Sequence, residues 1–143
     1  MGQALFFADA GPKIGLGHMV RCLSLADCLA MAGWRCTFVV PGDVERMLPG
    51  LRSRGHGFVG LDSAVDLLGP TTELRRRFPE IGVLVVDSYN AIANWEARQR
   101  DWAERVVVID DLANRRHDCD VLVDQTPGRN PSDYKDLVPE NCT

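Results

Sequence analysis

Short apolar runs without polar alternation set the strongest limit on the fold of this chain. Because apolar side chains fall on both sides of such a strand, both faces of the sheet must be covered, as they are in a parallel sheet between helices. The segments that predict strands are residues 4–8, 35–40, 57–61, 81–86, 105–110 and 121–124.

Helical patterns separate these runs. The predicted helices are residues 18–32, 43–54 with a break at Pro49-Gly50, 71–78 and 92–104. Gly33 fits the position just after the first of them. The alternation predicts βαβ units with right-handed crossovers, and hence a Rossmann-like, doubly wound, mostly parallel α/β sheet. Such sheets bind ligands at the carboxyl ends of their strands, near the point where the strand order reverses.

Length and composition favour one domain over residues 1–143. The net charge of -4 argues against a nonspecific nucleic-acid or anionic-membrane surface. No window approaches roughly 18 uninterrupted apolar residues, and the N-terminus lacks a signal-peptide pattern. We therefore expect a cytoplasmic protein with no nucleic-acid or membrane partner. The five cysteines include no C-x-x-C pair, so we expect reduced thiols and no metal site.

A glycine loop, residues 11–17, joins the first predicted strand to the first predicted helix. Glycine lets a ligand approach the backbone closely, and free N–H groups at a helix start attract anions. Gly15 and Gly17 are therefore candidate binding residues for a diphosphate or a sugar oxygen; the alternative is a simple tight turn. A dinucleotide fingerprint needs a third glycine where Val20 stands and an acidic residue near Val40, so we expect no nicotinamide cofactor.

His18 would stand at the start of the helix that follows this loop. The positive end of the helix dipole disfavours imidazolium, so we expect a neutral ring that can take a proton from water. The alternative is a histidine that only caps the helix. Arg21, one turn further on the same face, could contact a phosphate or hold a carboxylate such as Asp9. An ordinary structural ion pair is an equal alternative for Arg21.

Acidic residues follow the fourth and fifth predicted strands at the same edge of the sheet. Asp87 could orient the histidine or bind sugar hydroxyls, and Tyr89 could donate a hydrogen bond; the alternative for Asp87 is a helix cap. Strand residues alternate between faces, so at most one of Asp110 and Asp111 would face a shared site. We choose Asp110 as the candidate and expect the other to be a cap.

The other histidines are assigned to structural positions. His56 is expected in a solvated loop, and His117 with Cys119 is expected to be structural rather than a metal pair. The three tryptophans are expected to pack in the core, two of them on one face of the helix predicted over 92–104; they are Trp34, Trp95 and Trp102.

Several segments share their order and spacing with one known family. They are residues 14–26 (IGLGHMVRCLSLA), 86–89 (VDSY), 108–113 (VIDDLA) and 119–125 (CDVLVDQ), followed by Asp133-Tyr134 and residues 137–139. Together they resemble the PseG family, the UDP-2,4-diacetamido-2,4,6-trideoxy-β-L-altropyranose hydrolases of pseudaminic acid biosynthesis. The resemblance departs from the family pattern at Phe7 and Gly11-Pro12.

The resemblance implies the N-terminal half of a GT-B architecture, whose C-terminal UDP-binding domain is absent from this chain. It implies that His18 is the catalytic histidine and Tyr89 an active-site tyrosine. The implied reaction releases UDP and the free sugar, with water attacking the anomeric carbon, inversion, and neither metal nor cofactor. The supporting substrate-binding candidates are Asp9, Gly15, Gly17, Arg21, Asp87 and Asp110.

Two other functions stay open at this point. A GT-B glycosyltransferase would require a sugar or lipid acceptor rather than water. A noncatalytic sugar-binding fragment would release no UDP at all. Because a GT-B site lies between two domains, we expect residues 1–143 alone to be nearly inactive.

Overall fold

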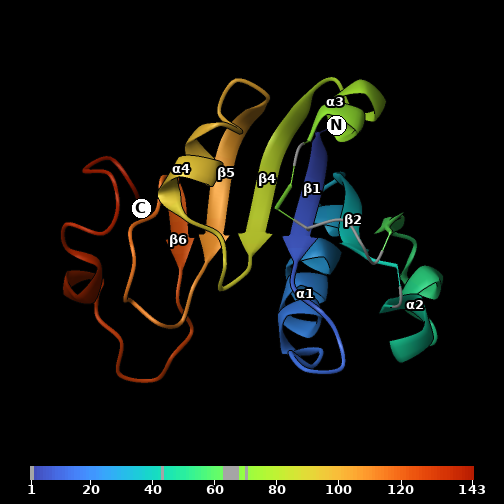
Figure 1. The fold of residues 1–143 in the computed structure, drawn as a ribbon, viewed down its shortest axis with the longest axis horizontal. Helices are drawn as coiled ribbons and strands as arrows, with labels where there is room; N and C mark the ends of the chain where they lie inside the picture. Colours follow the sequence, from blue (N-terminus) through green and yellow to red (C-terminus); the bar gives the residue numbers. More distant parts are fainter. Residues whose placement is uncertain (1, 43, 63–67, 70) are drawn as a thin grey trace.

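The computed structural model of the chain describes residues 2–42, 44–62, 68–69 and 71–143. The strands form one parallel sheet in the order β3-β2-β1-β4-β5-β6, which confirms the predicted Rossmann-like α/β fold (Figure 1). Their bounds are β1 Gln3–Ala8, β2 Arg35–Pro41, β3 Gly57–Leu61, β4 Ile81–Asp87, β5 Ala103–Ile109 and β6 Val121–Val123.

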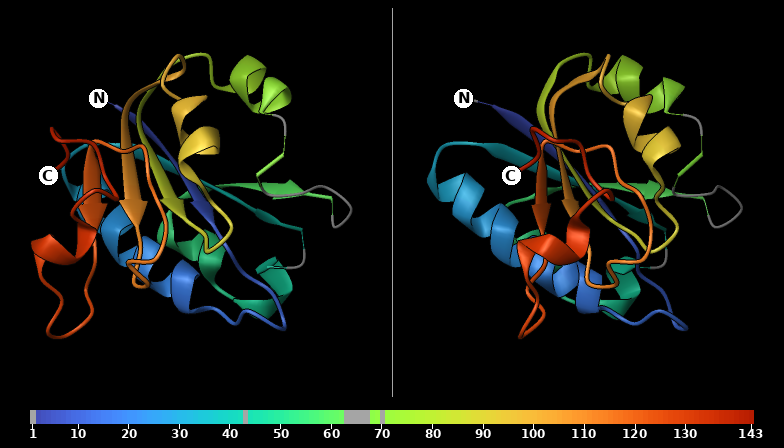
Figure 2. Two further views of the ribbon diagram at one scale, coloured as in Figure 1. Left: turned by 60° about the vertical axis from the view of Figure 1, so that its left-hand side comes forward. Right: turned by 90° about the vertical axis from the view of Figure 1, so that its left-hand side faces the viewer.

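Helices cover both faces of this sheet. They are α1 Gly17–Met31, α2 Val44–Met47, α3 Thr72–Arg77 and α4 Ala93–Ala97, with 3-10 turns at Leu51–Arg54 and Pro131–Tyr134. Helix α1 lies on one face, and α3 and α4 lie on the other (Figure 2). Within β1, Phe6 packs with the α1 side, and Leu5 and Phe7 pack with the α3 and α4 side. The unbroken apolar run of β1 is therefore explained by burial on both faces.

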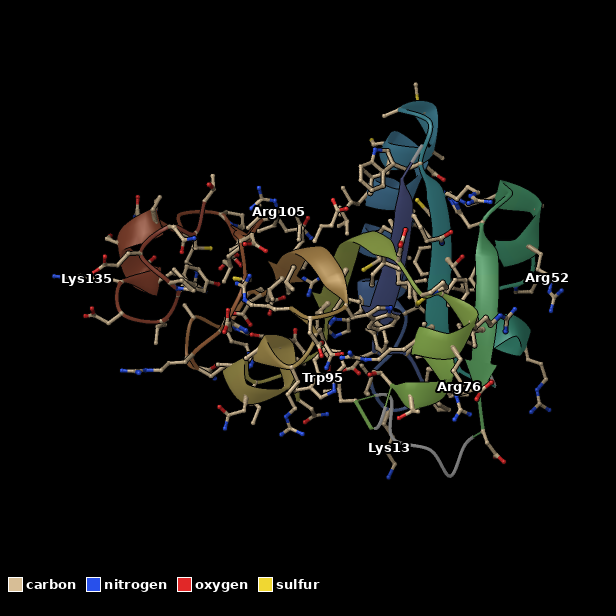
Figure 3. All side chains as sticks on the ribbon, turned by 90° about the horizontal axis from the view of Figure 1, so that it is seen from above. Lys13, Arg52, Arg76, Trp95, Arg105 and Lys135 are labelled. Atoms are coloured by element: carbon tan, nitrogen blue, oxygen red, sulfur yellow. The ribbon has the colours of Figure 1, made fainter. Side chains whose placement is uncertain are left out.

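The fourth predicted helix is much shorter than expected. Helix α4 ends at Ala97, residues 98–102 form turns, and β5 begins at Ala103. The Gln99 carbonyl accepts hydrogen bonds from the N–H groups of Trp102 and Ala103, which turns the chain back into the sheet. Trp95 lies on α4 (Figure 3) and Trp102 lies outside it, yet both pack in the same core cluster.

The segment predicted as a helix over 43–54 is not continuous. It contains α2 and a 3-10 turn, Leu51–Arg54, with the interruption at the predicted Pro49-Gly50 break. Gly50 between them has a φ of 91°, in the left-handed region that favours glycine. Residue 43, where the predicted helix begins, lies outside the described residues.

The strand order reverses between β1 and β4. From β1 the chain runs by way of α1 to β2 on one side, whereas β4 pairs with the other side of β1. The carboxyl ends of β1 and β4 and the start of α1 therefore meet at one edge, where this fold class binds ligands. Among the described residues, no helix has the length and apolar character needed to span a membrane.

Candidate active site at the carboxyl edge of the sheet

His18 and Asp87 form a buried pair at this edge. The His18 Nδ1 atom lies 2.5 Å from Asp87 Oδ1, and the two residues are 5% and 0% exposed. A carboxylate can only accept, so Nδ1 carries the proton and Nε2 carries the lone pair. No other described residue is hydrogen-bonded to Nε2. The pair therefore presents a histidine in the tautomer that can accept a proton.

Arg21 keeps Asp87 ionised. Its Nε and one terminal nitrogen donate to the two oxygens of Asp87 at 2.5 and 2.6 Å, a bidentate geometry. Burial by itself raises the pKa of Asp87, but the hydrogen bonds from Arg21 and His18 outweigh it and hold that pKa below its ordinary value. The hydrogen bond to Asp87 likewise raises the pKa of Arg21. Both groups are charged at neutral pH.

Cys22 is a neighbour of this pair that the sequence did not single out. Its thiol lies 3.6 Å from Asp87 Oδ2. Burial, and then the nearby carboxylate, raise the pKa of Cys22, so the sulfur stays a protonated thiol. Cys22 is therefore not a nucleophile of this site.

The glycine loop leaves the start of α1 open. Gly15 has a φ of 81°, and its N–H donates to the Gly11 carbonyl at 2.7 Å, which closes the loop. A Cβ built at Gly15 or Gly17 would meet nothing within 4 Å. The first turn of α1 holds no acidic residue and has no side-chain cap. Its first N–H groups, starting at Gly17, are therefore available to an anion.

Tyr89, which follows β4, and Asp9, which follows β1, lie beside the pair. The Tyr89 ring stands edge-on to the His18 ring, with centroids 4.7 Å apart. The Asp9 carboxylate accepts from the backbone N–H of Tyr89 at 3.2 Å, and so fixes the loop after β4. Burial, and then a hydrogen bond to Asp111, raise the pKa of Tyr89, so its hydroxyl stays a donor at neutral pH.

Of the two acids after β5, Asp111 joins the site and Asp110 does not, which corrects our choice. Asp111 Oδ2 accepts from Arg21 at 3.0 Å and from the Tyr89 hydroxyl at 3.2 Å. Asp110 is 1% exposed and is bonded to Arg115 and the N–H of Ala113. The expectation that one acid faces the site and the other caps the chain is thus confirmed, with the roles exchanged.

The register of the sheet explains this exchange. Asp87 and Asp110 each come directly after an apolar run, so the sequence suggests that they occupy equivalent positions at the ends of β4 and β5. In the structure Val86 pairs with Val108, so Asp87 stands beside Ile109 and Asp111 is two residues further on. Two residues along a strand restore the same face. The register of two strands cannot be read from a single sequence, so the sequence could not show that Asp111 rather than Asp110 lies on the same face as Asp87.

The remaining histidines lie away from the cluster. His117 Nδ1 lies 2.8 Å from Glu96 Oε1, and both side chains are fully buried, so its structural assignment is confirmed. The expectation that His56 is solvated is wrong. It is 8% exposed, because its Nε2 lies 2.8 Å from Asp27 of α1 and its ring packs near Phe38. No group of three described His, Cys, Asp or Glu side chains is arranged to hold a metal ion.

The arrangement combines a proton acceptor with an anion site. His18 supplies the acceptor, its position is set by Asp87, and the open start of α1 lies in the same segment of chain. Figure 3 shows the labelled basic side chains Lys13, Arg52, Arg76, Arg105 and Lys135 at separate places on the molecule. No family model and no curated protein matches this chain.

Proposed function

We propose that this chain is the base-bearing domain of a nucleotide-sugar hydrolase that releases UDP and the free sugar. One observation carries the proposal: His18 is held by Asp87, and its Nε2 has no hydrogen-bond partner among the described residues, beside the open N-terminus of α1 and at the reversal of strand order. A histidine held in this way acts as a general base. An anion site beside it suits a leaving diphosphate.

The proposed step is a displacement by water. The water oxygen forms a bond to the anomeric carbon on the side opposite the diphosphate, and one water proton moves to His18 Nε2. The bond from the anomeric carbon to the diphosphate oxygen breaks, and its electron pair leaves with UDP, so the configuration inverts. Asp87 stabilises the imidazolium that forms, as the carboxylate of a Ser-His-Asp triad does.

The leaving group is proposed to lie against the glycine loop. Gly15 and Gly17 leave room for it, and the amide groups at the start of α1 stabilise the charge that develops on the diphosphate. The carboxylates of Asp87 and Asp111 are engaged by Arg21 rather than free to repel it. Tyr89 closes the other side of His18.

The substrate class rests on the resemblance of residues 14–26, 86–89, 108–113 and 119–125 to the PseG family. It gives a UDP-linked diacetamido-trideoxyhexose as the proposed substrate. The same resemblance implies a C-terminal domain that holds most of the UDP. The Rossmann-like sheet is compatible with one half of a GT-B enzyme.

The test is UDP release without any acceptor. Protein made from its complete reading frame is incubated with UDP-2,4-diacetamido-2,4,6-trideoxy-β-L-altropyranose, and with UDP-N-acetylglucosamine for comparison. We expect release of UDP from the first that His18→Ala abolishes. Release only after a sugar or lipid acceptor is added would indicate a transferase, and binding without release would indicate a noncatalytic module. Either result overturns the hydrolase proposal.

A further inference from the structure

Asp111 has one oxygen that the domain leaves without a donor. Oδ2 accepts from both Arg21 and Tyr89, whereas Oδ1 is buried and has no hydrogen-bond partner among the described residues. A buried carboxylate oxygen without a donor is costly, and such atoms in native structures call for an explanation. The Asp111 side chain as a whole is 25% exposed, so its carboxylate lies at the edge of the site, where a donor from a ligand reaches Oδ1 once the atoms that cover it shift.

The position of Asp111 limits what that ligand group can be. Along the sheet, β4 lies between β1 and β5, so Asp87 separates the glycine loop from Asp111. The loop end offers free N–H groups that attract anions, whereas the Asp111 end offers a carboxylate oxygen that accepts hydrogen bonds from neutral donors. A ligand spanning both ends has its phosphates at α1 and hydroxyl or amide donors at β5.

We propose that Asp111 is a sugar-binding residue whose Oδ1 accepts a hydrogen bond from a hydroxyl or acetamido N–H of the substrate. The inference rests on the proposed function for the kind of ligand, and it goes further in assigning the sugar end of the site. Tyr89 donates to the same carboxylate and touches the His18 ring, so a sugar at Asp111 lies next to the proposed base.

Asp111→Asn separates this role from a purely structural one. Arg21 and Tyr89 both donate hydrogen bonds to Oδ2. The asparagine carbonyl oxygen therefore takes the position of Oδ2, and the contacts with both residues are kept. The amide nitrogen then occupies the place of Oδ1 and turns an acceptor into a donor. Asp111→Ala removes both oxygens. Asp101→Asn, at an exposed position, is the control for the loss of one negative charge.

The measurement is equilibrium binding by calorimetry, with UDP-2,4-diacetamido-2,4,6-trideoxy-β-L-altropyranose and with UDP alone, on protein from the complete reading frame. We expect Asp111→Asn to weaken binding of the UDP-sugar about 10–100-fold, close to the effect of Asp111→Ala. Binding of UDP alone, and all binding by Asp101→Asn, should change less than about twofold. In turnover, KM should rise while kcat changes little.

Three results would overturn the assignment. They are near-normal UDP-sugar affinity in Asp111→Asn with loss only in Asp111→Ala, an equal loss for UDP alone, and no binding of the UDP-sugar by the wild type. Hydrolysis is not required for the measurement. A wild-type protein that binds the UDP-sugar without cleaving it would refute the hydrolase proposal, while the affinity of Asp111→Asn would still decide the role of Asp111.

Discussion

The domain holds two histidines whose Nδ1 atom is paired with a buried carboxylate. His18 lies 2.5 Å from Asp87, and His117 lies 2.8 Å from Glu96. His117 and Glu96 are fully buried within the fold, and the second Glu96 oxygen accepts from the backbone N–H of Asp118. His18 stands at the sheet edge beside Tyr89, which is 42% exposed.

Pairing with a buried carboxylate does not by itself make a histidine a candidate catalytic base. Both carboxylates select the same tautomer, so the two pairs differ in what reaches Nε2. His117 Nε2 is enclosed and lies 3.9 Å from Asp110, whereas His18 Nε2 belongs to a residue that adjoins the open glycine loop. We therefore propose that the pair of His18 and Asp87 acts in catalysis, and that the pair of His117 and Glu96 stabilises the fold.

Exchange of each histidine for glutamine should give the largest difference between the two pairs. His18→Gln should lower UDP release about 10²–10⁴-fold, because the amide cannot take up the proton of water. Its thermal midpoint should fall less than that of His117→Gln, because Arg21 still pairs with Asp87. His117→Gln should show the reverse, with a lower midpoint and a normal rate while folded. Scanning calorimetry beside the UDP-release assay measures both, and equal loss of activity in the two variants would erase the distinction.

Removing the carboxylate of the enclosed pair tests its structural role. Glu96→Ala leaves His117 and the N–H of Asp118 without their acceptor inside the core. We expect the free energy of unfolding to fall by about 3–5 kcal/mol. Urea unfolding measures it. A loss under about 1 kcal/mol would show that this pair contributes little to the fold.

Asp87 should make stability depend on acidic pH. Its pKa in the folded protein lies below the ordinary value of 3.8, so folding favours the carboxylate. That stabilisation is present above about pH 4 and is lost as the pH falls through the folded pKa. Asp87→Asn should therefore flatten the acid limb of a plot of unfolding free energy against pH. An unchanged acid limb in Asp87→Asn contradicts the prediction.

Alanine substitutions at Gly15 and Gly17 should differ in their effect on the free energy of unfolding, by a smaller amount than the changes above. Gly15→Ala should cost about 1–2 kcal/mol of unfolding free energy, because its φ of 81° is unfavourable for alanine. Gly17→Ala has open space and no positive φ, so its stability should stay near that of the wild type while UDP-sugar binding weakens. Matched unfolding and binding curves check this, and equal destabilisation of both would refute the loop description.

Local sequence patterns were enough to predict the sheet and the centre of the candidate site. Apolar runs predicted the strands, and the residues just after β1 and β4 predicted the pairing of His18 with Asp87. For Arg21 the sequence suggested Asp9 as the carboxylate partner, whereas the structure pairs it with Asp87 and Asp111.

Two of the other errors have long-range causes. The register of β4 and β5 selected Asp111 over Asp110, and the contact with Asp27 on α1 buries His56. Both depend on contacts between distant segments, which periodicity does not encode. A further error is local, because the turn at Gln99 interrupts a segment whose apolar spacing is helical.

The most direct test of the central claim is hydrolysis of the UDP-sugar in oxygen-18 water without an acceptor. Mass spectrometry of the products locates the bond that water forms. We expect the label in the free sugar and none in UDP, at a rate that His18→Gln loses while His117→Gln keeps it. Label in UDP, or an undiminished rate in His18→Gln, would contradict the claim that His18 directs water to the anomeric carbon.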